Sequence, residues 1–171
     1  GTLVDGHPRT AIVHMVSQDG RDWEEYSAEA TVVLQGDGDT PWRAEVHQPS
    51  VVALDDGSLM MFYVGRNPLT GETALGTARA ASPDAEWHPD SEPLPFENEA
   101  PLAFERDGVA TPMVERRGHS LHLWYAGING SRSTIGYAVG VSTSGVLWSW
   151  HRYGPVLEAS QRWESQRVLA P

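Results

Sequence analysis

Cysteine is absent from this 171-residue chain, and basic residues and long apolar runs are scarce. Without thiols there is neither a disulfide framework nor a thiolate metal site. Twelve Lys and Arg stand against 23 Asp and Glu, a net charge of −11, which argues against the basic surface that nucleic acid requires. No apolar stretch approaches the roughly 18 residues of a membrane-spanning helix. The sequence therefore predicts neither a nucleic-acid nor a membrane partner.

What the chain does have is an internal repeat. Val-x-x-Pro occurs three times, each time shortly after an aromatic residue, in the segments 42–49, 104–112 and 163–171. The prolines are 63 and then 59 residues apart. A period of this size is typical of a repeated supersecondary unit that buries its apolar faces only by stacking on its neighbours.

The first two motifs are followed by the same elements in the same order. An apolar segment meets a polar turn, then come an aromatic-rich strand, a Gly-x-Ala strand, a Trp and a short Pro-containing strand. In the two copies these are 50–54 and 113–114, 59–65 and 121–127, 75–78 and 135–138, Trp87 and Trp148, and 93–94 and 155–157. Each unit thus reads as four short antiparallel strands joined by Gly, Asp and Pro turns.

The two ends of the chain supply parts of the same unit. Residues 12–17 correspond to its third strand and 32–34 to its fourth, whereas 163–171 correspond to its beginning. We therefore interpret residues 1–171 as a single, partial domain, with complete units at 42–103 and 104–162 and partial units at 1–41 and 163–171. A sheet of this kind buries both its faces when copies of it are arranged around a central axis and each packs on its neighbours. The predicted fold is therefore all-β, a β-propeller of four-stranded blades.

Two segments also carry a helical pattern. Residues 21–35 contain neither Gly nor Pro and place apolar side chains at roughly helical intervals, and 158–169 have a similar helix propensity. The corresponding segments of the other units contain Gly and Pro, which break helices. We therefore predict strand and loop in both places.

Several motifs stand in a fixed order along the unit: Val-x-x-Pro, an apolar strand ending Tyr-x-Gly, Ile-Gly-x-Ala, the turn Ser-x-Asp-Gly-x-x-Trp, found here at 17–23, and a final Pro-Val-Leu. Together they resemble the blades of five-bladed propellers of the arabinanase–levansucrase type, which include glycoside hydrolases and phosphorylases. The resemblance implies a carbohydrate-active protein that binds oligo- or polysaccharides, needs no cofactor and works outside the cell or in the periplasm. The turn at 17–23 also resembles the Asp-box of sialidase-like propellers, a further alternative.

Glycoside hydrolysis uses two carboxyl groups, one protonated and one ionised. In the group that this chain resembles, such acids often stand beside the Pro that starts an inner strand, and here Gln48, Thr111 and Ala170 take that place. Acids just upstream of the motifs are Glu45, Glu105, Asp107 and Glu164. We take Glu45, Asp107 and Glu164 as candidate catalytic residues, with a non-catalytic sugar-binding or structural propeller as the alternative.

Polar residues near the motifs suit a polyhydroxyl ligand. His47, Gln48, Thr111 and Arg66 are the candidate substrate-binding residues, because their side chains donate or accept hydrogen bonds. His119 and His122 resemble a metal pair, but an odd spacing on a strand directs them to opposite faces, so no metal site is predicted.

The length of the chain bears on its assembly. Five blades of this size need about 300 residues. We therefore expect the 171 residues to belong to a longer protein, or to associate with a second copy that completes the ring.

Overall fold

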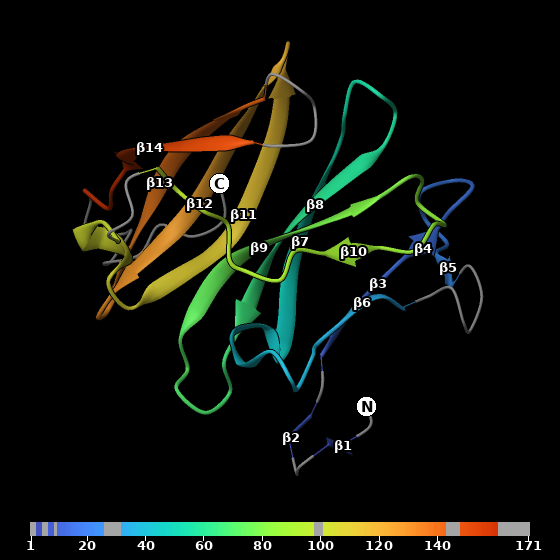
Figure 1. Cartoon of the computed structure of the whole chain (residues 1–171), viewed down its shortest axis with the longest axis horizontal. Helices are drawn as coiled ribbons and strands as arrows, with labels where there is room; N and C mark the ends of the chain where they lie inside the picture. The colour runs from blue at the N-terminus through green and yellow to red at the C-terminus, as the bar shows by residue number, and fades with distance from the viewer. Residues whose placement is uncertain are drawn as a thin grey trace.

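The computed structural model of the chain describes residues 3–4, 7–8, 10–25, 32–97, 101–142 and 148–160 (Figure 1). In this part of the chain every regular element is a strand, apart from two single-turn 3₁₀ helices, η1 (Pro41–Arg43) and η2 (Ala103–Glu105). No helix among these residues is long and apolar enough to cross a membrane. The all-β prediction is confirmed.

Two antiparallel four-stranded sheets form most of the structure. One consists of β7 (Glu45–Ala53), β8 (Leu59–Arg66), β9 (Thr73–Ala80) and β10 (His88–Pro89), and the other of β11 (Gly108–Arg117), β12 (Ser120–Asn129), β13 (Arg132–Val141) and β14 (Ser149–Leu157). In both, neighbouring strands follow one another in the chain, so each sheet is a meander. Figure 1 shows the two sheets side by side, as stacked blades are arranged.

The N-terminal residues form smaller strand pairs. β3 (Ala11–Val13) pairs with β6 (Val32–Gln35), and β4 (Met15–Val16) with β5 (Glu24–Glu25), while β1 (Leu3–Val4) pairs with β2 (His7–Pro8). Ile12 lies opposite Leu34, so the predicted third and fourth strands of the first unit do pair. The described residues between 21 and 35 contain no helix, as expected.

The fourth strand of the first complete unit is not where the sequence predicts it. The prediction places it at 93–94, whereas β10 spans His88–Pro89. Leu94 still donates its backbone N–H to the carbonyl of Leu75 in β9 at 2.8 Å, so the predicted segment does contact the third strand. Pro89, Pro93 and Pro95 lack the N–H that a continuous strand needs, which explains why the pairing is interrupted. In the second unit, 155–157 do lie in a strand, β14.

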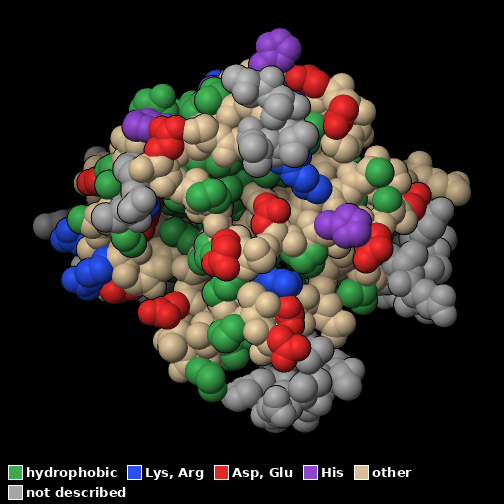
Figure 2. Space-filling view, in the orientation of Figure 1, with side chains coloured by type: hydrophobic (Ala, Val, Ile, Leu, Met, Phe, Trp, Pro, Cys, Tyr) green, Lys and Arg blue, Asp and Glu red, His purple; other side chains and the backbone are tan. Residues whose placement is uncertain are grey.

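The β7–β10 sheet is buried on both faces because its side chains alternate. On one face Met60, Phe62 and Val64 join a core with the β11–β14 sheet. On the other, Met61 and Tyr63 join a core with the β3–β6 pair. This sheet is therefore sandwiched between its two neighbours, whereas acidic side chains are spread over the outer surface visible in Figure 2.

Equivalent aromatic pairs mark the repeat. Trp42 in η1 stacks on Tyr63 in β8, and Phe104 in η2 stacks on Tyr125 in β12, with ring centroids 6.2 Å apart in both cases. Both tyrosines are fully buried. The two complete units thus share internal contacts as well as strand order.

The two tyrosine hydroxyls differ in their partners, which predicts different effects on stability. Tyr125 donates to Glu105 Oε1, whereas the Tyr63 hydroxyl has no partner within the described residues. Tyr125→Phe should lower the free energy of unfolding by about 1.5–3 kcal/mol, and Tyr63→Phe should leave it unchanged or raise it. Urea denaturation of both variants tests this, and equal losses would contradict it.

High pH should unfold the protein through these same groups. Burial raises the pKa of Tyr63 to about 12, and burial with the hydrogen bond to Glu105 raises the pKa of Tyr125 further. Unfolded tyrosine ionises near pH 10, so the stability is present below pH 10 and is lost as the pH rises through the folded-state values. Circular dichroism during an alkaline titration should show a transition that Tyr63→Phe shifts upward; an unshifted transition would exclude Tyr63 as a cause.

Candidate functional site

The first strand of each sheet is distorted at the same place. The pairing of β7 with β8, and of β11 with β12, slips across the Val-x-x-Pro motif. At the slip, the backbone angle φ is 53° at Gln48 and 45° at Thr111, values that residues other than glycine rarely adopt. Each such residue costs about 1–3 kcal/mol, and strain of this kind gathers at functional sites.

The two distorted segments are in direct contact. Gln48 Oε1 accepts a hydrogen bond from the Thr111 amide at 2.8 Å, and Ser50 Oγ accepts one from the Val114 amide at 3.0 Å. Side chains of β7 thus bind backbone groups of β11. The structure brings together the predicted binding residues Gln48 and Thr111, and the Thr111 hydroxyl is buried with no partner in the described part of the chain.

Next to this contact lies a charged cluster formed by Glu45, His47 and Arg66, here named the Glu45 cluster. Glu45 and Arg66 are opposite one another on β7 and β8, and Arg66 Nη1 donates to Glu45 Oε2 at 2.6 Å. His47 Nε2 lies 3.7 Å from the same oxygen. The carboxylate is nearly buried, whereas the arginine and the histidine are partly exposed. Three predicted site residues therefore form one group.

The chemistry of the Glu45 cluster suits a polar ligand. The guanidinium and imidazole can donate to hydroxyl groups, and the carboxylate can accept from them. Acid–base hydrolysis of a glycosidic bond requires a second carboxyl group. Within the described residues, no second carboxylate is hydrogen-bonded or ion-paired to the Glu45 cluster.

Asp107 makes its contacts at a turn. Its carboxylate accepts from Arg106 Nε at 3.1 Å and from the Gly130 amide at 2.5 Å. The Arg106 guanidinium, together with the Gly130 amide, holds the pKa of Asp107 below its usual range. These bonds connect the residue to the turn between β12 and β13 and not to the Glu45 cluster.

Glu105 points into the core. Its carboxylate accepts from Arg152 Nη1 at 2.6 Å, from the Tyr125 hydroxyl and from the Leu102 amide at 2.9 Å. Both partners of the ion pair are buried. These three bonds hold the carboxylate inside the core. Glu164, the remaining acid, lies outside the described residues.

The two histidines of β12 and its preceding turn have separate partners. His119 Nδ1 lies 3.1 Å from Asp55 Oδ2, and His122 Nδ1 lies 2.5 Å from the Tyr137 hydroxyl. The described residues contain no group of three or more His, Asp or Glu side chains that could hold a metal ion.

Two threonines that hold the first strands in place were not identified from the sequence. Thr10 Oγ1 accepts from the Val46 amide at 2.6 Å, and Thr73 Oγ1 accepts from the Val109 amide at 2.8 Å. Each bond joins one unit to the next and fixes the strand that carries the distorted motif. The available signal is spacing, because both threonines precede the valine of a Val-x-x-Pro motif by 36 residues.

No protein-family model and no curated protein matches the chain. Solved structures do. Zg3597, a family 117 glycoside hydrolase of the marine bacterium Zobellia galactanivorans, is 21% identical with a TM-score of 0.65, over 84% of this chain and 41% of that protein. A structure from the GH130 family of mannoside phosphorylases is 16% identical with a TM-score of 0.61, over 90% of this chain and 43% of that protein. This family contains glycoside hydrolases that target β-1,2-mannosidic linkages in Candida mannan.

A glycosyl hydrolase of Bacteroides ovatus is also similar, at 16% identity and a TM-score of 0.55, over 67% of this chain and 33% of that protein. The chain thus spans less than half the length of these enzymes. At such identities the similarity concerns the fold, and it supports the propeller architecture indicated by the stacked four-stranded sheets.

Proposed function

We propose that this chain is part of a five-bladed propeller that acts on the glycosidic bonds of oligo- or polysaccharides, with the Glu45 cluster in its ligand site. The observation that carries the proposal is the position of this cluster directly before the strained Gln48, on a strand whose distortion recurs in the next sheet. The similarity in fold to glycoside hydrolases and to the GH130 family supports it.

The residues of the site divide into two roles. Arg66 and His47, partly exposed, bind sugar hydroxyls together with Gln48. Glu45, paired with Arg66, acts as the base or as a ligand for a hydroxyl. For the second carboxyl group that hydrolysis needs, Asp107 and Glu164 are the candidates in this chain.

A second function, sugar binding without catalysis, has its own support. Gln48 and Thr111 stand beside the prolines where the resembling enzymes carry acids, and the Glu45 cluster contains one carboxylate. In this alternative the same side chains hold a carbohydrate and no bond is broken.

Replacing Glu45 with Gln should separate the two functions. We expect Glu45→Gln to reduce turnover by about 10²- to 10⁴-fold, because the amide cannot transfer a proton, while carbohydrate binding changes much less. The assay measures release of sugar from aryl-glycosides and from arabinan, fructan and β-1,2-mannan oligomers, with and without inorganic phosphate, in the longest natural form of the protein.

Glu115→Gln is the matched control. Glu115 also pairs with an arginine, Arg117 Nη2 at 2.8 Å, but lies on the exposed end of β11. It should keep full activity. Equal activity of Glu45→Gln and the parent would refute catalysis by Glu45, and a parent that binds these oligomers without cleaving any of them would favour the binding function.

A further inference from the structure

The contacts between successive units follow a rule that the last described sheet leaves incomplete. A hydroxyl at the start of the third strand of one unit accepts from the valine amide on the first strand of the next. Thr10, just before β3, does so for Val46, and Thr73, the first residue of β9, for Val109. Thr73 Oγ1 also donates to the Val109 carbonyl at 2.7 Å. The hydroxyl therefore holds both polar groups of the incoming residue.

Ser133 occupies the corresponding position on β13. Thr73 is opposite Arg66 on β8, one residue beyond Gly65, and Ser133 is opposite Ile128 on β12, one residue beyond Gly127. Ser133 is 4% exposed, and its Oγ has no hydrogen-bond partner in the described part of the chain. Because buried hydroxyls are nearly always paired, this group needs a partner that the described residues do not supply.

A second buried hydroxyl fits the same rule. The Gln48 side chain accepts from the amide of Thr111, its counterpart in the next unit. Thr111 stands in the Gln48 position, and its own Oγ1 is buried without a partner among the described residues. Ser133 and Thr111 thus stand at the positions where, in the preceding unit, Thr73 and Gln48 each bind a backbone amide of the next unit.

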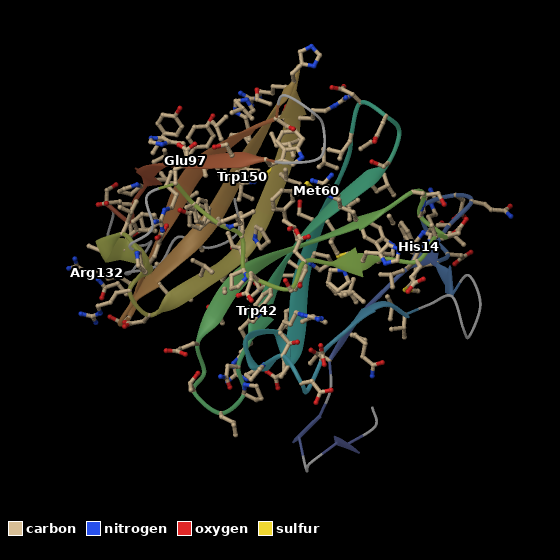
Figure 3. All side chains as sticks on the ribbon, viewed as in Figure 1. His14, Trp42, Met60, Glu97, Arg132 and Trp150 are labelled. Carbon is tan, nitrogen blue, oxygen red and sulfur yellow. The ribbon has the colours of Figure 1, made fainter. Side chains whose placement is uncertain are left out.

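The surface beside Ser133 contains a cleft, whereas the equivalent place beside Thr73 is filled by the first strand of the next sheet. A cleft of about 370 Å³ is lined by Phe104, Asn129, Ser133 and Thr134, among others. At the equivalent place, Gly108 at the start of β11 lies so close that an added Cβ would be 2.4 Å from Thr73 Oγ1. In Figure 3 Arg132, next to Ser133, lies on the side of the β11–β14 sheet away from the β7–β10 sheet.

The face of the β11–β14 sheet on this side is aromatic, with His122 and Arg117 in contact with its rings. Trp124 and Tyr137 have ring centroids 5.3 Å apart, and Tyr137 contacts Tyr153, which is 63% exposed. Phe62, the counterpart of Trp124 on β8, is instead covered by Trp150 of the next sheet at 5.3 Å. The preceding sheet therefore shows what this kind of face binds, which is another sheet.

We propose that Ser133 and Thr111 are the docking points for the first strand of a following blade, and that its occupant is the segment 163–171 of this chain. The sequence of this segment supplies the required groups. Val168 is the valine of the third Val-x-x-Pro motif and follows Ser133 by 35 residues, and Ala170 takes the position of Gln48 and Thr111. The Val168 amide donates to Ser133 Oγ and the Ala170 amide to Thr111 Oγ1.

Amide hydrogen exchange measured by NMR on the whole chain tests the proposal, independently of any activity. In the parent protein the Val168 amide should exchange at least 10-fold more slowly than in an unfolded peptide. Ser133→Ala should remove that protection and leave Val109 unchanged, whereas Ser133→Thr should keep it. Thr73→Ala is the matched control and should expose the Val109 amide.

Several results would overturn the proposal. One is a Val168 amide that exchanges at the unfolded rate in the parent, or that is equally protected in Ser133→Ala. Protection that depends on protein concentration, together with a dimeric mass, would identify the occupant as a second copy. Protection that arises only with added oligosaccharide would assign the face to sugar.

A second measurement remains decisive if Ser133→Ala does not fold. The chain has no cysteine, so a Ser133→Cys/Val168→Cys pair can be oxidised without competition. It should form an intrachain disulfide to the same extent as Thr73→Cys/Val109→Cys, whose positions are in contact. Failure of the first pair where the second succeeds would refute the proposal.

Discussion

Arg152→Met should lower the free energy of unfolding by about 3–5 kcal/mol, because it leaves the carboxylate of Glu105 inside the core without its cationic partner. Arg152 Nη1 and Glu105 Oε2 are 2.6 Å apart, and their side chains are 5% and 3% exposed. The guanidinium also lies 4.6 Å from the centre of the Phe96 ring. Methionine keeps much of the volume and removes the charge, so the loss reports the broken ion pair together with the lost contact to the Phe96 ring.

Arg66→Met provides the matched comparison. Its bond to Glu45 has the same length, 2.6 Å, but the two side chains are 42% and 11% exposed. Since solvent screens such a pair, this variant should lose about 1 kcal/mol or less. Urea denaturation followed by circular dichroism measures both. Similar losses in the two variants would contradict the role of burial, and the double change Arg152→Met/Glu105→Leu should recover most of the first loss.

Gly136→Ala should be almost as damaging, with a loss of about 1–3 kcal/mol from overpacking. A Cβ at Gly136 would lie 2.7 Å from Phe104 Cζ and 2.9 Å from Tyr125 Cζ. These rings stack on one another and Tyr125 is fully buried, so neither can move away freely. Gly76 has the same relation to Tyr63, at 2.4 Å, which explains the glycine in both Gly-x-Ala motifs.

Shortening the obstructing ring should rescue this variant. In a Phe104→Leu background the nearest two atoms to the added Cβ are gone, so Gly136→Ala should cost clearly less there than in the parent. Thermal unfolding of the four proteins of the cycle measures the difference. Strictly additive effects would show that the added methyl group does not meet Phe104.

The fold could be predicted because its signals repeat. Val-x-x-Pro, Tyr-x-Gly and Gly-x-Ala fall in the first, second and third strands of both four-stranded sheets. A single copy of any of these motifs would not predict a fold, but the same order of motifs in two copies predicts a repeated four-stranded unit. The fourth strand was misplaced in the first complete unit because three prolines there interrupt the pairing that alternation alone suggests.

The site could be predicted only in part. Glu45 and Arg66 meet because the register of β7 with β8 brings them opposite one another. His47 joins them because residues two positions apart on a strand, such as Glu45 and His47, lie on the same face. Glu105 lies just upstream of a Val-x-x-Pro motif, as Glu45 does, yet η2 turns it toward Arg152, a residue 47 positions away. The sequence contains no local signal of that distant partner, and the same holds for the bond between Asp107 and the amide of Gly130.

The slip in β7 and β11 has a consequence for how the repeat can diversify. Ladder pairing closes on both sides of Gln48 and of Thr111, while these residues themselves have no partner across the strand. The side chain at this position therefore has no neighbour across the strand to match, and Gln48 uses it to bind the Thr111 amide of the next sheet. The three copies carry Gln, Thr and Ala there. The residue at this position can therefore differ between copies without breaking the ladder on either side of it.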